Sequence, residues 1–170
     1  MSERLQNVIE KMHSEFEIEV ETFRGENTLF VKAADLLNVM QALRDQHEFT
    51  QCMDVTAVDY YPAETGRFHV VYQLYSMPHN DRIQVRVRLD GNAPTIESVQ
   101  GIYPGANWRE REVYDLFGII FNNHPDLRRI VMPQDWVGHP LRKDYPLGYE
   151  EVQFTFNFDE IMKNKPHPRD

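Results

Sequence analysis

Apolar residues in the first third of the chain recur first at helical and then at strand spacing. The first stretch predicts an amphipathic helix over residues 3–14, capped by Ser2, with an apolar stripe made of Leu5, Val8, Ile9 and Met12. Apolar and acidic residues then alternate from Phe16 to Glu21, which is typical of a half-buried strand with one solvated face. Turn-forming residues at 24–27 separate this strand from residues 28–32, so the two are predicted to form a hairpin.

A second helix and three further strands are predicted before residue 90. Helical spacing resumes behind Asp35 and ends near His47. Strand alternation follows over residues 53–61, 68–75 and 83–89, with turn-forming residues between the runs. Two helices, a hairpin and an antiparallel meander predict an α+β fold, with an antiparallel or mixed sheet and helices packed on one of its faces.

The pattern changes after Gly91. One short helix is predicted over residues 107–117, ended by Gly118 as a C-cap, with Arg111 and Asp115 paired one turn apart. Beyond it, prolines at positions 125, 133, 140 and 146 are too closely spaced for a long helix or a central strand, so residues 122–149 are predicted to be an ordered loop.

These patterns divide the chain into three parts. Residues 1–103 are expected to form a compact α+β domain, and residues 104–149 a docking segment. The docking segment is rich in arginine and tryptophan, a composition typical of protein interfaces. Residues 150–170 are expected to form an extended C-terminal tail, because phenylalanines alternate at positions 154, 156 and 158.

Composition and charge exclude several classes of function. The chain has 170 residues, of which 41% are hydrophobic, and a net charge of −9. That negative charge argues against autonomous binding to nucleic acid or to an anionic membrane surface. No apolar run is long enough for direct membrane insertion, and no export signal is visible, so a cytoplasmic location is expected. The single cysteine, Cys52, excludes an iron–sulfur cluster held by cysteines of this chain alone.

The charge is unevenly distributed along the chain. Residues 1–66 contain 13 acids and 5 bases, whereas residues 107–149 contain 6 of each. Arginine and carboxylate side chains are interleaved in the second range. This pattern predicts ion pairs, either within the chain or with a partner.

The acids and histidines of residues 110–139 also allow a catalytic interpretation. A metal-assisted hydrolase could use the set Glu110, Glu112, Asp115, His124, Asp126, Asp135 and His139. Their spacing matches no familiar zinc, calcium or nucleophile motif, and each carboxylate has an arginine close by in sequence, so ion pairs are the stronger interpretation. His124 and His139 each precede a proline and are expected to make hydrogen bonds rather than bind metal. Trp108 and Trp136 are expected to pack or to anchor an interface.

Two runs of sequence resemble one known family. Residues 108–130 begin Trp-Arg-Glu-Arg-Glu-Val-Tyr-Asp-Leu-Phe-Gly, and residues 138–145 read Gly-His-Pro-Leu-Arg-Lys-Asp-Tyr. Both closely resemble the signature of the C subunit of NADH-quinone oxidoreductase, the peripheral-arm subunit family of respiratory complex I that is related to the photosynthetic J subunit. The run Val-Thr-Ala-Val-Asp-Tyr at residues 55–60 also resembles this family, so the resemblance covers most of the chain.

The resemblance implies a non-catalytic structural and assembly subunit. In such complexes FMN, the iron–sulfur clusters and quinone are held by partner subunits, and the whole assembly is a proton-pumping NADH:quinone oxidoreductase. The expected partners are the large quinone-site subunit and neighbouring iron–sulfur subunits of the peripheral arm. The implied location is peripheral, on the cytoplasmic side of the inner membrane of the cell, and no catalytic, cofactor-binding or metal site is expected in this chain.

The residues expected to bind these partners are charged and aromatic side chains of the docking segment. They are Trp108, Glu110, Arg111, Glu112, Asp115, His124, Arg128, Arg129, Trp136, His139 and Arg142. The same scaffold role in a related membrane-bound hydrogenase, or in a ferredoxin- or F420-dependent dehydrogenase, stays open as an alternative. The electron donor of such machines binds other subunits, so this chain does not distinguish them.

Overall fold

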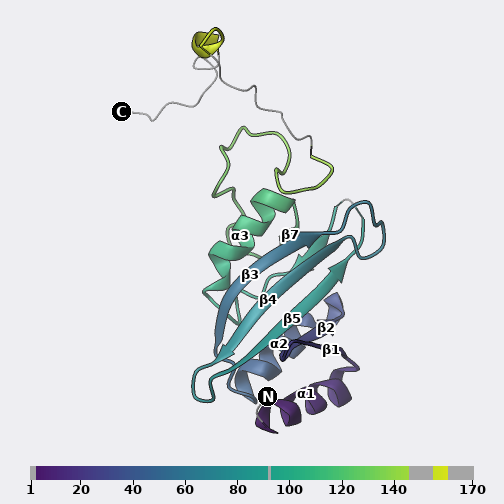
Figure 1. The fold of residues 1–170 in the computed structure, drawn as a ribbon. Coiled ribbons are helices and arrows are strands. Elements are labelled where there is room, and N and C mark those ends of the chain that lie inside the picture. Colours follow the sequence, from purple (N-terminus) through teal and green to yellow (C-terminus); the bar gives the residue numbers. More distant parts are fainter. Residues whose placement is uncertain (1–2, 92, 146–154, 161–170) are drawn as a thin grey trace.

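The computed structural model describes residues 3–91, 93–145 and 155–160 (Figure 1). In chain order its elements are α1 (Glu3–Phe16), β1 (Glu19–Phe23), β2 (Glu26–Val31), η1 (Ala33–Asp35), α2 (Leu36–Asp45), β3 (Gln51–Asp59), β4 (Phe68–Ser76), β5 (Asp81–Leu89), β6 (Thr95–Glu97), α3 (Ala106–Phe117) and β7 (Ile120–Asn122). Every helix and strand predicted before residue 90 is present close to its expected position.

Five strands form one mixed sheet in the order β1-β2-β5-β4-β3. The predicted hairpin is confirmed as antiparallel β1 and β2, and the predicted meander as antiparallel β3, β4 and β5. These two units meet through β2 and β5, which pair in parallel over Thr28–Val31 and Gln84–Val87. A parallel pair needs a long crossover connection, and here the crossover contains α2, β3 and β4.

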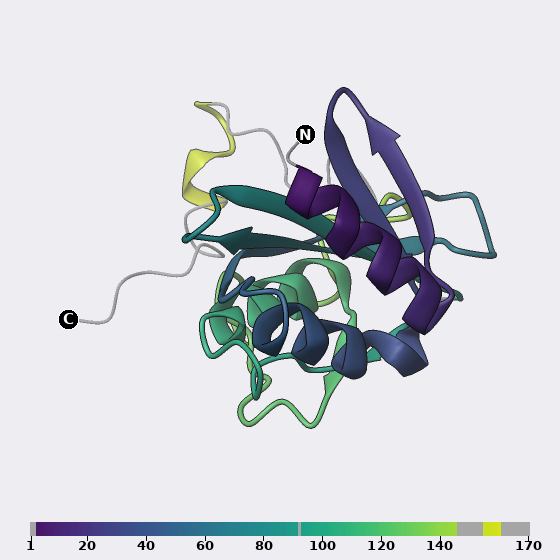
Figure 2. The ribbon, with the colours of Figure 1, turned by 90° about the horizontal axis from the view of Figure 1, so that it is seen from below.

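One face of this sheet is buried beneath the helices. Figure 2 shows α2 and α3 on the same side of the sheet. The stripe of α1 that the sequence predicts is buried in the same core, through Leu5, Val8, Ile9 and Met12. On β5 the inward side chains are Ile83, Val85, Val87 and Leu89, as the alternation predicts. The packing of helices on one face is therefore confirmed, and the core runs on past residue 103 as far as Phe121.

A second, two-stranded sheet brackets α3. β6 and β7 pair in parallel over three residues each, too short for the sequence pattern to reveal them. Gly118 ends α3 in the left-handed conformation (φ 72°), and its N–H donates to the carbonyl of Tyr114 at 2.8 Å, so the predicted C-cap is confirmed. A Cβ at this position would lie 2.5 Å from the ring of His139. Glycine therefore serves both the backbone conformation and the close approach of the chain beyond β7.

The C-terminal region is described only over residues 155–160. These residues form a turn and one helical turn, where the alternation of phenylalanines predicts extended chain. Phe156 and Phe158 are exposed, at 86% and 44%. The rest of the expected tail, including Phe154, lies outside the described residues.

The packing of α2 in the core contributes to the free energy of unfolding. Leu43 is fully buried in the core. Leu43→Ala is expected to lower the free energy of unfolding by about 2–5 kcal/mol, because it removes apolar contacts and leaves a cavity. Leu141 is 51% exposed, so Leu141→Ala is expected to cost less than about 1 kcal/mol. Urea unfolding of both variants measures the difference, and equal costs would contradict this account of the core.

Candidate functional site

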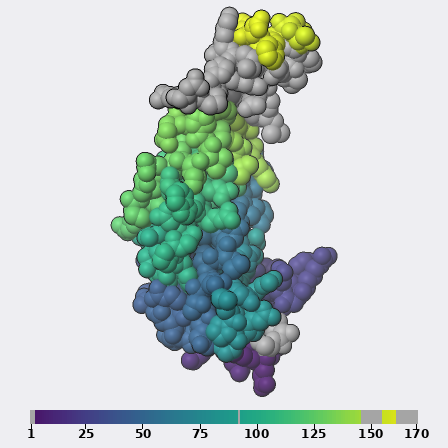
Figure 3. Space-filling model, turned by 90° about the vertical axis from the view of Figure 1, so that its left-hand side faces the viewer, coloured from purple at the N-terminus to yellow at the C-terminus, as the bar shows by residue number. Residues whose placement is uncertain are grey.

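Residues 123–145, called the loop segment from here on, follow β7 without a helix or strand. This agrees with the loop predicted from the spacing of prolines. Figures 1 and 3 show the loop segment, in green, gathered with α3 at one end of the molecule. It is nevertheless tied to the rest of the chain by three sets of buried polar contacts, described in turn below.

The carboxylate of Asp115, on α3, is the first anchor and is fully buried. Its Oδ2 accepts hydrogen bonds at 2.8–3.0 Å from three consecutive backbone N–H groups, those of Ile130, Val131 and Met132. Its Oδ1 accepts a hydrogen bond from Nη1 of Arg129 at 2.7 Å. Burial raises the pKa of Asp115, but these four donors lower it by more, so the net shift is downward. The group stays ionised at neutral pH.

The pairing expected between Arg111 and Asp115 is wrong. Asp115 faces the loop segment, where its four donors converge. Arg111 is also largely buried, and its guanidinium donates to the carbonyl groups of Arg128 and Arg129 at 3.1 and 3.4 Å. It also lies 5.0 Å from the ring centroid of Trp108. Two turns of one helix thus hold the same piece of loop by opposite means, a carboxylate binding N–H groups and a guanidinium binding carbonyl groups.

A second group of contacts closes the end of α3. Nη2 of Arg129 donates to the carbonyl of Gly138 at 3.0 Å, and Nδ1 of His139 lies 2.8 Å from the carbonyl oxygen of Asp115. Arg142 donates from Nε to the carbonyl of Phe117 at 2.6 Å. Burial lowers the pKa of His139, and the neighbouring arginines lower it further. His139 is therefore a neutral donor to α3, as expected of a histidine beside a turn.

The third anchor joins the loop segment to the sheet and was not predicted from the sequence. Asp59, at the end of β3, and Arg67 form a doubly hydrogen-bonded pair at 2.9 and 3.0 Å, with side chains 1% and 4% exposed. Asp59 also accepts the backbone N–H of Lys143 at 2.9 Å, and Arg67 pairs with Asp144 at 2.9 Å. Burial raises the pKa of Asp59, whereas Arg67 and the backbone donors lower it by more. An aspartate directly after the apolar run Ala57-Val58 was the available signal.

Glu110 is a buried acid whose role is internal. It is fully buried between α3 and the residues after β6, where Ser98 donates to Oε2 at 2.5 Å and the N–H of Val99 donates to Oε1 at 2.8 Å. Burial raises the pKa of Glu110 to about 7, against the opposing effect of these two donors. His124 lies 3.8 Å away through Nε2, and its Nδ1 accepts the N–H of Asp126.

The remaining predicted site residues lie nearer the surface. Trp108 is 61% exposed, and Glu112 and Arg128 form exposed ion pairs with Arg109 and Asp126. Trp136 is half-buried, and its Nε1 is a buried atom with no hydrogen-bond partner in the described structure. The predicted set is thus brought to one end of the molecule, but Glu110, Arg111, Asp115, Arg129, His139 and Arg142 are occupied by contacts within the chain.

Part of the surface that the three anchors present is apolar. Four aliphatic side chains of the loop segment are more than a third exposed, namely Ile130, Val131, Val137 and Leu141, and Val137 reaches 83%. Together with Trp108 they make exposed hydrophobic positions on a backbone held by buried charges. These aliphatic residues were not predicted as site residues, because charge and aromatic content guided that choice. The signal for them in the sequence was the presence of apolar residues within a proline-rich loop.

The hydrolase interpretation finds no support in this arrangement. Over the described ranges, no group of three or more histidine, cysteine or acidic side chains could hold a metal ion. The two most buried acids, Glu110 and Asp115, accept hydrogen bonds from backbone and side-chain donors instead. Cys52 is a half-buried thiol whose pKa is raised to about 12, mainly by burial. A thiol of this kind is unreactive at neutral pH.

The fold and the anchored loop define a small α+β protein that displays exposed apolar side chains on an ordered loop. The chain belongs to the family described as the respiratory-chain NADH dehydrogenase 30 Kd subunit, whose model matches residues 29–151. The family expected from the sequence is therefore confirmed.

Curated relatives are similar over most of the chain. The C subunit of NADH-quinone oxidoreductase from Geobacter metallireducens is 52% identical over 130 residues, which are 76% of this chain and 80% of the relative. The protein of the same name from Roseiflexus sp. is 47% identical over 150 residues, 87% of this chain and 86% of the relative. Homologues of this chain are thus subunits of an oxidoreductase complex of the respiratory chain.

Two solved structures share the fold. A trypsin-resistant fragment of Nqo5 is 34% identical and superposes with a TM-score of 0.65, covering 73% of this chain and 99% of the fragment. A chain of the membrane-bound sulfane sulfur reductase, described as an archaeal respiratory membrane complex, has a TM-score of 0.68 at 21% identity, covering 85% of this chain and 87% of that one. The second match shows the fold alone.

Asp115→Asn tests the first anchor. The amide keeps the shape of the side chain but replaces one acceptor oxygen with an NH2 donor. At least one of the donors from residues 129–132 is then left without an acceptor. We expect the free energy of unfolding to fall by about 3 kcal/mol, with faster hydrogen exchange at residues 130–132. Asp126→Asn, in an exposed pair with Arg128, is the matched control and is expected to cost less than about 1 kcal/mol. Unchanged exchange at residues 130–132 would refute the role given to Asp115.

Glu110 gives a pH-dependent stability with a defined sign. Its pKa is about 7 in the folded chain, against 4.5 as the ordinary value. The folded state therefore binds the extra proton between these values, and stability falls as the pH rises from about 4.5 to about 7. Glu110→Gln is expected to remove this component of the pH profile, measured by urea unfolding at several pH values. Glu112→Gln, on the exposed side of α3, should leave the profile of the wild type.

Proposed function

We propose that this chain is a structural and assembly subunit of the peripheral arm of a proton-pumping NADH-quinone oxidoreductase. Its loop segment and the exposed part of α3 dock on the large subunit beside the quinone site. The observation that carries this proposal is that fully buried ionised groups anchor a loop with exposed apolar side chains. A loop with that construction is already ordered before it meets a partner, so little conformational entropy is lost on binding.

The chemistry of the exposed positions supports a protein partner. Val131, Val137, Leu141 and Trp108 are exposed apolar side chains on one end of the molecule. Exposed apolar clusters rimmed by charge mark protein interaction sites, and tryptophan is enriched among residues that dominate binding energy. The arginine and acidic side chains around them, including Arg128 and Glu112, form the polar rim of such a surface.

In this proposal this chain holds its partner subunits in place, and the partner subunits carry out the catalysis. FMN, the iron–sulfur clusters and quinone belong to partner subunits, and neighbouring iron–sulfur subunits contact this chain. The buried ionisable groups of the loop region hold backbone groups, which fits a scaffold. No helix in the described part of the chain is long and apolar enough to cross a membrane. A peripheral position on the cytoplasmic side of the membrane, reached through the partners, is the corresponding proposal.

A second candidate keeps the scaffold role and changes the machine. The fold is shared with a chain of an archaeal respiratory complex whose name refers to sulfane sulfur reduction. A related hydrogenase, ferredoxin-dependent or F420-dependent complex could use the same subunit in the same way. Identity of 45–52% to relatives named as NADH-quinone oxidoreductase subunits favours the first candidate. Identification of the proteins that co-purify with this chain separates the two.

Val137→Glu tests docking by the loop segment. A charge placed in an apolar interface loses its hydration without gaining a partner, at a cost of a few kcal/mol. We expect the amount of this chain that co-purifies with the complex to fall by about tenfold or more. Turnover per assembled complex is expected to be unchanged. Quantitative mass spectrometry of the purified complex and NADH:quinone activity measure the two quantities.

Met77→Glu is the matched control for this experiment. Met77 is also exposed, at 60%, but lies at the β4–β5 turn away from the loop segment. The control is expected to assemble normally. Normal assembly of Val137→Glu with lost quinone reduction would argue against a scaffold role and for a direct role in the reaction.

A further inference from the structure

The sheet face that points away from α2 and α3 carries arginine and aromatic side chains. We call it the open face, and its principal side chains come from β2, β4 and β5, namely Phe30, His69, Tyr75, Arg82, Arg86 and Arg88. Cross-strand register places these residues together, with Arg82 opposite Tyr75 and Arg88 opposite His69. Phe30 of β2 lies opposite Arg86. Helices α2 and α3 pack on the other side of the sheet (Figure 2).

Three arginines on one strand dominate the open face. Arg82, Arg86 and Arg88 project from β5, and each guanidinium lies near an aromatic ring. Arg88 is 4.0 Å and Arg86 5.9 Å from the centroid of Phe30, and Arg82 is 5.7 Å from that of Tyr75. These contacts hold the guanidinium groups in place on the face, ready for planar hydrogen bonding to a carboxylate.

Two of the three arginines lack a carboxylate partner in the part of the chain that the structure describes. Arg88 pairs with Glu19 at 2.8 Å, but within the residues that the structure describes no carboxylate lies within 4.0 Å of Arg82 or Arg86. The Nε of Arg86 and the Nδ1 of His69 are buried atoms without a hydrogen-bond partner in the same ranges. Burial and the two nearby arginines lower the pKa of His69 to about 4, so His69 is neutral and the positive charge comes from arginine alone.

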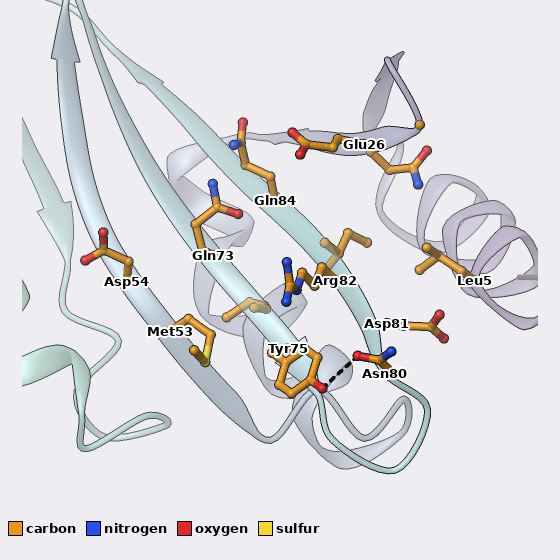
Figure 4. A pocket seen from close by; sticks show the side chains of 14 residues that line it. Leu5, Glu26, Met53, Asp54, Gln73, Tyr75, Asn80, Asp81, Arg82 and Gln84 are labelled. Carbon is orange, nitrogen blue, oxygen red and sulfur yellow. Dashed lines mark hydrogen bonds between the residues drawn. The ribbon is translucent and has the colours of Figure 1, made fainter. Parts of the chain in front are cut away.

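The open face is also hollowed at one end. A groove of about 1040 Å³ lies there, with Gln73, Tyr75, Arg82 and Gln84 along the sheet and Glu26 at the side (Figure 4). It forms because β2 begins at Glu26 but pairs with β5 only from Thr28, so the hairpin diverges from the sheet. Asn27, at this divergence, is 2% exposed, and its Nδ2 has no hydrogen-bond partner among the described residues. Amide, guanidinium and carboxylate groups thus line a recess large enough for a peptide segment, since Asp54 and Asp81 also lie along it.

We propose that the open face is a second docking surface, which binds an acidic segment of another protein of the same complex through Arg82 and Arg86. Arginine and aromatic residues are enriched in protein interfaces, and unpaired guanidinium groups complement carboxylates. Along β5 the outward positions hold three arginines and Gln84 but no acid, whereas the acids Glu19 and Glu21 of this face lie on the edge strand β1.

Three acids also line the groove, namely Glu26, Asp54 and Asp81, of which Asp54 and Asp81 pair with Arg109 and Arg4. A nucleic acid would bring a phosphate at every nucleotide along these acids, whereas a protein segment can place its acids at Arg82 and Arg86 alone. The inference rests on the proposed function, because the partner is a member of the same assembly.

Photocrosslinking in the assembled complex locates the partner. Gln84 is replaced by p-benzoylphenylalanine in the full chain, the complex is purified after irradiation, and the crosslinked peptides are sequenced by mass spectrometry. The same replacement at Val137 reports on the loop segment. We expect the Gln84 probe to label a segment of another subunit in which acids outnumber bases. Labelling of a second copy of this chain, of nucleic acid or of a basic segment, or no labelling, overturns the proposal.

Charge-reversal variants test the energetic contribution. Arg82→Glu with Arg86→Glu is expected to lower retention of this chain in the complex about tenfold at 0.3 M salt. Lys11→Glu with Lys32→Glu makes the same change of charge at exposed positions outside the groove and should leave retention unchanged. Arg82→Gln with Arg86→Gln removes the charge at similar size and should give a smaller loss, which settles the matter if the glutamate variant unfolds. Equal retention of the glutamine variant and wild type, with no Gln84 crosslink, refutes the proposal.

The experiments test the two proposed docking surfaces independently. A crosslink from Val137 without one from Gln84 leaves the proposed function standing and removes only the open face. Absence of both crosslinks, with Val137→Glu assembling normally, removes the proposed function as well.

Discussion

The buried carboxylate of Asp115 is the constraint on which the displayed surface of this protein depends. A fully buried ionised group is expensive unless its hydrogen-bonding capacity is filled. Here three backbone N–H groups and one guanidinium fill it, and all four come from residues 129–132. The helix can keep this charge only when the loop is in place. The burial of one acid therefore fixes the path of a segment that has no secondary structure of its own.

The sequence patterns predicted local structure well and long-range pairing poorly. The hairpin, the meander and both N-terminal helices followed from periodicity, because spacing reports which side of an element is buried. Periodicity does not report which strand becomes a neighbour, so the parallel pairing of β2 with β5 was not foreseen. The same limit applied to the site. Arg111 was paired with Asp115 by proximity along the helix, whereas the structure pairs Asp115 with Arg129, fourteen positions away.

Residue type alone is a poor guide to chemistry in this protein. The acids and histidines of residues 110–139 include residue types that are common in active sites. Glu110, Asp115 and His139 nevertheless make hydrogen bonds to backbone groups within the protein. The exposed apolar surface comes instead from residues such as Val131 and Val137, whose side chains have no reactive groups. The two faces of the protein differ accordingly. An apolar loop held by buried charge lies at one end, and arginine and aromatic side chains cover the open sheet.

The parallel joint between β2 and β5 has a consequence for synthesis of the chain. β2 ends at Val31 and β5 begins at Asp81, so about fifty residues must be made before the hairpin has a strand to join. At roughly 5–20 residues per second this leaves the hairpin waiting for several seconds on the ribosome. Its edge strand carries Glu19 and Glu21, and charge on an edge discourages pairing with other strands. These acids thus protect the outer edge of the hairpin both while it waits and in the finished sheet, where β1 remains an edge strand.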